Sequence, residues 1–313
     1  MVGFLGRRLL QLIVTMLGIV TVAFFLMRAI PGDPATYILG DYATTEALAT
    51  LRSQLGLDRP VVEQYFIFLG RALTGNLGSS VVTGQPALQE ILTSLPSSAA
   101  LALSGLAVAI AIGVPLGIMS AVRQGTWVDL AIMLGALAGI SFPVFWVGLV
   151  AILFFAHWLD LFPALGATSS PNLLDQIYYL MLPALVFGFS IAAYIARLTR
   201  SAMLEVLNQD YIRVARSMGI SENKIVFRYA LRNALIPILA VIGVTFAWAF
   251  GNAILIEVVF SRPGVGSTLL KAILARDYQL VQAGVLVLAA IVVVINVSLD
   301  MAYGFIDPRL RNT

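Results

Sequence analysis

The stretch DYIRVARSMGISENKIVFRYALRNALIP, Asp210–Pro237, is the most informative part of the sequence. Four apolar residues recur at the i, i+3, i+4 and i+7 spacing of one helix face: Tyr211, Val214, Ala215 and Met218. A separate polar stripe of the same helix carries Asp210, Arg213 and Arg216. Gly219 follows the last turn, where glycine commonly ends a helix, and Ser221 stands where the next helix would be capped.

Beyond that turn, basic residues recur every four positions on a second helix, which leads into an apolar segment at Pro237: Lys224, Arg228 and Arg232. A basic amphipathic loop resting on anionic lipid is one interpretation of this pattern. The glycine turn between two short helices, with a proline just inside the next apolar segment, favours another. This second interpretation predicts a rigid helix-turn-helix protrusion formed by Asp210–Pro237, called the knob below, which pushes on a soluble partner.

The composition places this knob in a membrane protein. Of 313 residues, 60% are apolar and 11% are charged, and the mean hydropathy is +0.94, whereas a soluble domain is about 45–50% apolar and about 25% charged. This excludes a water-soluble enzyme, a disordered chain and a fibre. The absence of cysteine excludes a disulfide scaffold and a thiolate metal site, and the single histidine, His157, leaves little for catalysis. We therefore expect no catalytic residue and no bound metal.

Reading between charged residues predicts six apolar stretches long enough to span a bilayer, which needs about 20 residues. The first is longer than a signal-peptide core and no small-x-small site follows it, so it is expected to be retained. The six are Leu9–Met27 and stretches within Ala99–Val122, Leu130–Leu159, Gln176–Ala196, Asn233–Ile256 and Tyr278–Leu299.

The distribution of charge predicts the orientation. With the N-terminus in the cytoplasm, 12 of the 19 Lys and Arg residues fall in inside segments, as the positive-inside rule requires. Both termini are then cytoplasmic, and a long extracytoplasmic loop, about Ile30–Ser98, joins the first two spans. We expect residues 1–95 to form the first helix and this outer region. Residues 96–304 form the transmembrane domain, with a cytoplasmic loop at about 200–234, and residues 305–313 form a cytoplasmic tail.

The segment Asp210–Gly219 resembles the conserved cytoplasmic loop of ABC-importer permeases, in the variant form of dipeptide, oligopeptide and nickel importers. Ala215 matches the second alanine of the family's Glu-Ala-Ala motif, but Arg213 and Val214 stand at the two preceding positions. Further short segments resemble the B-type permease subunit of that branch in the same order along the chain: Ile30–Pro34, Leu55–Pro60, Gly75–Ser80, Ser141–Trp146, Arg197–Leu207, Phe260–Gly266, Arg276–Tyr278 and Asp307–Arg309.

The resemblance implies an all-α, type I ABC importer permease in a bacterial inner membrane. The chain has no phosphate-cradling P-loop, so ATP and Mg²⁺ would be bound by partner subunits and this chain would not be an enzyme. The partners implied are a homologous C-type permease subunit, two ABC ATPase subunits or domains, an extracytoplasmic binding protein and membrane lipid, with no nucleic acid. The residues implied to couple ATPase motion to the spans are Asp210, Arg213, Ala215, Arg216, Gly219, Asn233 and Pro237.

Polar residues inside predicted spans are candidates for the substrate path, because they are costly in lipid and usually face an interior. Interhelical hydrogen bonding or packing explains most of them equally well. The candidates are Ser141, Thr245, Trp248, Asn252, Glu257 and Asn296.

Several alternatives stay open. The cargo is predicted to be di- or oligopeptides, but a nickel chelate, glutathione or a sugar-derived solute would suit the same machine. An ion-coupled secondary transporter usually has broken helices or mid-membrane charge, and six unbroken spans argue against it. An intramembrane serine protease would need a histidine facing a serine within the bilayer, and His157 lies at a span boundary.

Overall fold

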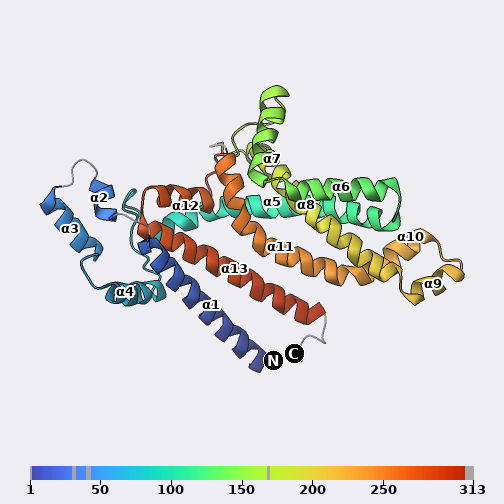
Figure 1. Ribbon diagram of the computed structural model, residues 1–313, viewed down its shortest axis with the longest axis horizontal. Helices are drawn as coiled ribbons and strands as arrows, with labels where there is room; N and C mark the ends of the chain where they lie inside the picture. The colour runs from blue at the N-terminus through green and yellow to red at the C-terminus, as the bar shows by residue number, and fades with distance from the viewer. Residues whose placement is uncertain (1, 30–32, 40–43, 168–169, 307–313) are drawn as a thin grey trace. The chain divides into compact units, whose positions relative to one another are not determined.

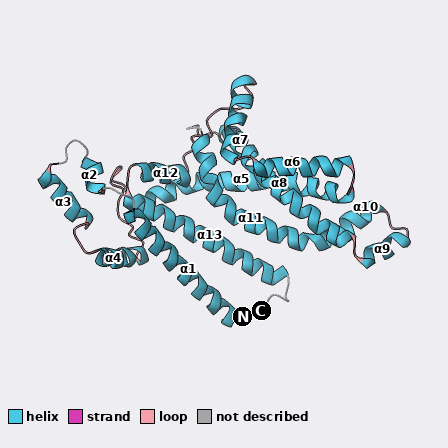
Figure 2. Ribbon diagram, viewed as in Figure 1, coloured by secondary structure: helices cyan, strands magenta, loops and turns pink. Residues whose placement is uncertain are grey.

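The computed structural model describes residues 2–29, 33–39, 44–167 and 170–306, in which helices are joined by turns and loops and the one β-contact described is an isolated bridge between Ser79 and Pro86 (Figures 1 and 2). The α-helices are α1 Val2–Ala29, α2 Pro34–Leu39, α3 Thr45–Leu55, α4 Val61–Leu73, α5 Ala87–Val122, α6 Trp127–Ser141, α7 Val144–Ala151, α8 Leu173–Leu207, α9 Asp210–Ser217, α10 Glu222–Lys224, α11 Leu231–Val259, α12 Val265–Leu274 and α13 Tyr278–Ile306. Two wider π-helical segments, Ile152–Trp158 and Ile225–Ala230, continue α7 and α10. Residues 307–313 of the expected tail lie outside the described residues.

The chain packs as two units. The first consists of Met1–Ser97 with Pro263–Val294, and the second of Ser98–Arg262 with Ile295–Thr313. The long helices α5 and α13 each contribute to both units, so neither unit is a continuous piece of sequence.

The first unit is built around α12, the start of α13 and the start of α5. Their apolar side chains form one buried cluster that includes Ile91, Leu269 and Val281. The carboxylate of Asp277 fastens the loop between α4 and α5 to this cluster, because it accepts hydrogen bonds from the Ser80 hydroxyl at 2.6 Å and the Leu280 amide at 3.1 Å. This loop is thereby fixed against the beginning of α13.

The second unit is organised around α8, which packs against α6, α7 and α11. Glycines make the closest approach: a Cβ at Gly113 would lie 2.8 Å from the Ala192 carbonyl oxygen, and one at Gly117 would lie 2.6 Å from that of Ala196. Backbone atoms cannot give way at such distances, so these glycines are what lets α5 lie directly on α8.

Among the described residues, four helices are long and apolar enough to cross a membrane: α5, α8, Glu222–Val259 and the Tyr278–Leu299 part of α13. The bent pair Trp127–Ser141 and Val144–Trp158, whose axes differ by 100°, is a fifth candidate and is either one broken span or a re-entrant loop. The apolar part of α1, Gln11–Leu26, is a shorter helix by the same measure.

The expectation of an unbroken third span, within Leu130–Leu159, is wrong. The helix stops at Ser141, and Phe142 adopts an extended conformation with φ −83° and ψ 132°. The cause is Pro143, which disfavours helical backbone at the residue before it and cannot donate to the preceding turn. A count of apolar residues does not detect this break, because it gives no weight to the backbone effect of Pro143.

Two other helix boundaries differ from those predicted from the sequence. The helix of the second predicted span begins at Ala87 rather than near Ala99. The fourth, α8, runs through Arg197 and Arg200 to Leu207 instead of ending at the first charge. The segment expected to be loop from about residue 197 is therefore a continuation of a long helix that carries the knob at its end.

Candidate functional site

The knob predicted from the sequence is present at the end of α8. Helix α9 begins at Asp210, and a single turn separates it from α10, which passes through a π-helical segment into α11 (Figure 1). Gly219 lies in that turn with φ +75°, a conformation that a residue with a side chain rarely adopts. The backbone amide of Ile220 closes the turn on the Ala215 carbonyl at 3.2 Å. Ser221 precedes α10, although its side chain makes no capping hydrogen bond.

The apolar residues of α9 divide into two faces. Ile212 and Ala215 are buried in a cluster with Met203, Ile225 and Ala234, which fixes α9 to the ends of α8 and α11. The other three residues of the predicted stripe point away from this cluster and are exposed, Tyr211 by 43%, Val214 by 55% and Met218 by 72%. The inward face thus includes Ile212, which the predicted stripe omitted.

The charged residues of α9 are paired within the chain. The Arg216 Nε donates to Glu222 Oε1 at 2.8 Å, which joins α9 to α10 across the glycine turn. Arg213 Nη1 lies 3.3 Å from Asp210 Oδ1, and both side chains are highly exposed. The cross-turn pair braces the knob, and the exposed charges remain available to solvent or a partner.

Asn233 and Pro237 lie where the knob joins α11. The Asn233 side-chain amide donates to the Tyr211 hydroxyl at 2.8 Å and to the Tyr229 carbonyl at 3.0 Å. Because Pro237 has no amide proton, the helix lacks the hydrogen bond that this position would give to the Asn233 carbonyl. Asn233 therefore ties α9 to the first turn of α11, next to the position where the helix lacks one backbone hydrogen bond.

An ion pair that the sequence did not reveal lies beside the knob. Arg200, on α8, donates from Nε and Nη2 to the two carboxylate oxygens of Asp129, on α6, at 2.7 Å each. The same carboxylate accepts from the Ser120 hydroxyl at 2.5 Å and the Gly125 amide at 3.0 Å. Its side chain is 8% exposed. The turn between α5 and α6 is thus bound to the part of α8 that leads into α9.

The candidates for the substrate path fall in different environments. Trp248, 75% exposed, and Asn252, whose amide donates to the Trp248 carbonyl at 3.1 Å, share one face of α11. Thr245 and Glu257 of the same helix are buried, and the Ser98 hydroxyl donates to Glu257 at 2.5 Å. Ser141 ends α6 with its hydroxyl on the Leu137 carbonyl, and Asn296 is exposed on α13. The structure brings together Trp248 and Asn252, and it does not gather all six.

Within the described part of the chain, no group of three His, Asp or Glu side chains is placed to hold a metal ion. His157 lies in the π-helical segment at the end of the bent pair.

The described part of the chain thus combines apolar helices of membrane-spanning length with a braced helix-turn-helix knob between α8 and α11. The chain belongs to the family described as binding-protein-dependent transport system inner membrane component, whose model matches residues 113–312. The N-terminal model of the same family matches residues 1–102.

Named relatives align over nearly their whole length. The dipeptide transport system permease DppB of Alkalihalophilus pseudofirmus is 39% identical, over 99% of this chain and 100% of its own. The di/tripeptide transport system permease DppB of Pseudomonas aeruginosa is 38% identical, over 100% and 99%. A putative peptide transport system permease of Brucella abortus is 40% identical, over 99% of each chain.

Proposed function

We propose that this chain is a pore-forming permease subunit of an ATP-driven importer of di- and oligopeptides. The observation that carries the proposal is the exposed apolar face of α9, formed by Tyr211, Val214 and Met218, on a helix whose other face is buried in its own core. Such a face on a rigid support fits a protein partner. In this family that partner is expected to be an ABC ATPase, and the names of the peptide permease relatives favour peptide as the cargo.

In this proposal the chain crosses the membrane six times, through α1, α5, the bent pair, α8, α11 and α13, with both termini in the cytoplasm. The region from α2 to the start of α5 is extracytoplasmic and receives a substrate-binding protein. A homologous C-type permease completes the pore, and two ATPase subunits or domains bind ATP and Mg²⁺.

The contacts of α9 support a rigid-body mechanism. Ile212 and Ala215 hold it to the core, Asn233 holds it to α11, and Arg216 braces the turn through Glu222. Closure of the ATPases on α9 would therefore move the C-terminal end of α8 and the beginning of α11 together, without bending the knob between them. Movement of packed helices as a body is how alternating access is commonly achieved.

The ion pair between Asp129 and Arg200 extends this rigid body to the α5–α6 turn. The exposed face of α11 that carries Trp248 and Asn252 is our candidate for the pore surface. Thr245 and Glu257, being buried within the unit, would instead support the position of that helix.

Two alternatives remain distinguishable by experiment. The same machine could carry a nickel chelate, glutathione or another small solute, because a separate binding protein selects much of the cargo. The bend at Phe142–Pro143 is a broken span of the kind found in secondary transporters, but membership of the family favours ATP-driven import.

The test is uptake into proteoliposomes that contain the whole complex with its binding protein. Labelled dipeptide and nickel are offered in parallel, with and without ATP inside and with and without the binding protein. The proposal expects dipeptide uptake that requires both ATP and the binding protein. Nickel uptake alone would change the cargo, and uptake by this chain without ATP would contradict the importer assignment.

A further inference from the structure

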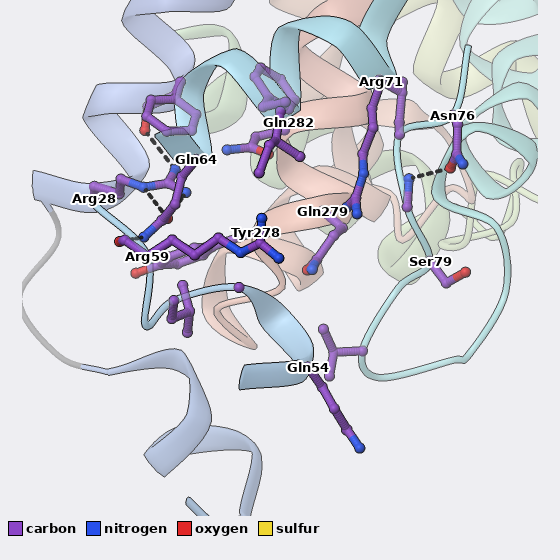
Figure 3. Close-up of a pocket in the computed structure, with 18 of the residues that line it drawn as sticks. Arg28, Gln54, Arg59, Gln64, Arg71, Asn76, Ser79, Tyr278, Gln279 and Gln282 are labelled. Carbon is purple, nitrogen blue, oxygen red and sulfur yellow. Dashed lines mark hydrogen bonds between the residues drawn. The ribbon is translucent and has the colours of Figure 1, made fainter. Parts of the chain in front are cut away.

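The first unit contains a cavity of about 570 Å³ between α1, α3, α4 and the start of α13 (Figure 3). Its lining includes four arginines, and no Asp or Glu is found among the described residues that line it. The arginines are Arg28, Arg59, Arg71 and Arg276. So much positive charge around one space, without a carboxylate in the wall, indicates an anionic ligand.

The carboxylates near this cavity are already engaged. Glu63 Oε1 accepts from Arg59 Nη1 at 3.0 Å, four residues away in the sequence. Asp33 accepts from the Nε of Arg52, which is not a lining residue, at 2.6 Å. Asp277 is held by the Ser80 hydroxyl and backbone amides. The charge of the cavity therefore stays positive after these groups are counted.

Donors in the wall are held in place. The Arg28 guanidinium lies 3.5 Å from the centroid of the Phe24 ring and donates from Nε to Gln64 Oε1 at 3.1 Å, as Figure 3 shows. These contacts fix its plane, and no Asp or Glu of the described residues is paired with it. Pre-positioned planar guanidinium groups suit a phosphate, whose several oxygens accept from more than one fork.

Gln282 adds an uncharged polar group to the cavity wall. This residue of α13 lines the cavity and is only 8% exposed, yet among the described residues its side-chain amide has no hydrogen-bond partner. In the described part of the chain, the Thr199 hydroxyl is the one buried side-chain polar atom that lacks a partner, so the Gln282 amide is itself accessible from the cavity. The NH₂ of Gln282 is therefore a donor that the protein itself does not use.

The cavity lies where the membrane helices end. Arg28 is in the last turn of α1 and Tyr278 is the first residue of α13. Helix α4, which supplies Arg71 to the wall, carries an exposed apolar stripe on its opposite face: Val62, Phe66 and Leu73. Such a stripe is what an interfacial helix presents to the boundary between headgroups and acyl chains. An interfacial position for α4 would put the cavity at the depth of lipid phosphates.

From these observations we propose that the cavity is a binding site for a phosphoryl group, supplied by the headgroup of an anionic phospholipid. Arg28 and Arg71 would hold the phosphate oxygens, and Gln282 would donate to the ester or to the polar headgroup. The same chemistry would accept a soluble phosphate ester, and the experiment separates these two sources. This inference does not depend on which solute the permease carries.

The experiment uses the assembled complex purified in detergent. Fluorescent dihexanoyl-phosphatidylglycerol is titrated by anisotropy, and unlabelled dihexanoyl-phosphatidylglycerol, dihexanoyl-phosphatidylcholine and glycerol 3-phosphate are used as competitors. The variants are Arg71→Gln and Gln282→Leu. The matched control is Lys271→Gln on α12, which removes the same charge from the same unit at an exposed residue outside the cavity wall.

We expect saturable binding of the glycerol headgroup and much weaker competition by the choline headgroup. Loss of one charge-assisted contact in Arg71→Gln should weaken binding about tenfold. Gln282→Leu should also weaken it, and Lys271→Gln should bind like the wild type. Equal binding of the two lipids, or wild-type affinity in Arg71→Gln, would overturn the proposal. Competition by glycerol 3-phosphate at the same concentration as the lipid would overturn the lipid source in favour of a soluble ester.

Discussion

Replacement of Asp129 by alanine tests the ion pair that joins α6 to α8. In the wild type the carboxylate accepts four hydrogen bonds, two of them from Arg200. Its side chain is 8% exposed and that of Arg200 is 25% exposed. The variant therefore leaves a largely buried guanidinium without its counter-ion, beside a Ser120 hydroxyl that has lost its acceptor.

Removing one partner of a buried ion pair costs about 3–5 kcal/mol. Because the Arg200 side chain still reaches some solvent, we expect the lower end, about 3 kcal/mol. For a unit of this size, each kcal/mol lowers the unfolding midpoint by about 2–4 °C, which predicts a fall of roughly 6–12 °C.

The assay is thermal unfolding of the purified complex in detergent. The control is Asp210→Ala, because its carboxylate is 94% exposed and lies 3.3 Å from Arg213, and it should shift the midpoint by no more than about 1 °C. The double variant Asp129→Ala with Arg200→Met should melt above the single variant, since no charge is left unpaired. A wild-type midpoint in Asp129→Ala, or a lower one in the double variant, would refute the reasoning.

Three further predictions concern the knob and the helix contacts. Met218→Glu places a charge on the exposed face of α9, so co-purification of the ATPase should be lost while the permease keeps its unfolding midpoint; retained ATPase would mean that this face is not the docking surface. Gly117→Ala puts a Cβ 2.6 Å from the Ala196 carbonyl oxygen and should destabilise by about 1–3 kcal/mol in thermal unfolding, whereas Gly135→Ala, with open space around it, should be neutral; equal effects would show that α5 and α8 are not in close contact. Asn233→Ala and Tyr211→Phe remove the same hydrogen bond, so their effects on uptake should not add in the double variant; simple additivity would show that the bond does not link α9 to α11.

Much of the knob was predictable because its signals are local. The helical spacing of Asp210–Arg216, the glycine at 219 and the proline at 237 each act on the backbone within one or two turns, and the structure has a helix, a left-handed turn and a re-entry there. Which apolar residues of α9 face inward was not predictable in the same way. An apolar side chain can serve the chain's own core or a partner, and Ile212 serves the first while Tyr211 faces outward.

Contacts between distant parts of the sequence could not be predicted. Asp129 and Arg200 each look like a charge at the end of a span, and nothing in either local sequence indicates that they meet. The same is true of the cavity in the first unit, whose arginines come from four separate segments. The bend at Phe142–Pro143 is different, because its cause is local and the proline alone was sufficient to indicate it.

The most direct test of the account measures whether the turn of the knob transmits ATPase motion. ATP-dependent dipeptide uptake is compared for complexes that carry one of two variants. Gly219→Val forces a β-branched residue into φ +75°, and Gly56→Val imposes the same kind of strain at φ +67°, at the residue that follows α3. Both glycines have open space around them, so steric clash is excluded as a difference. The account predicts that Gly219→Val loses uptake while its subunits stay assembled and Gly56→Val keeps it. Wild-type uptake in Gly219→Val would contradict the coupling role of the knob.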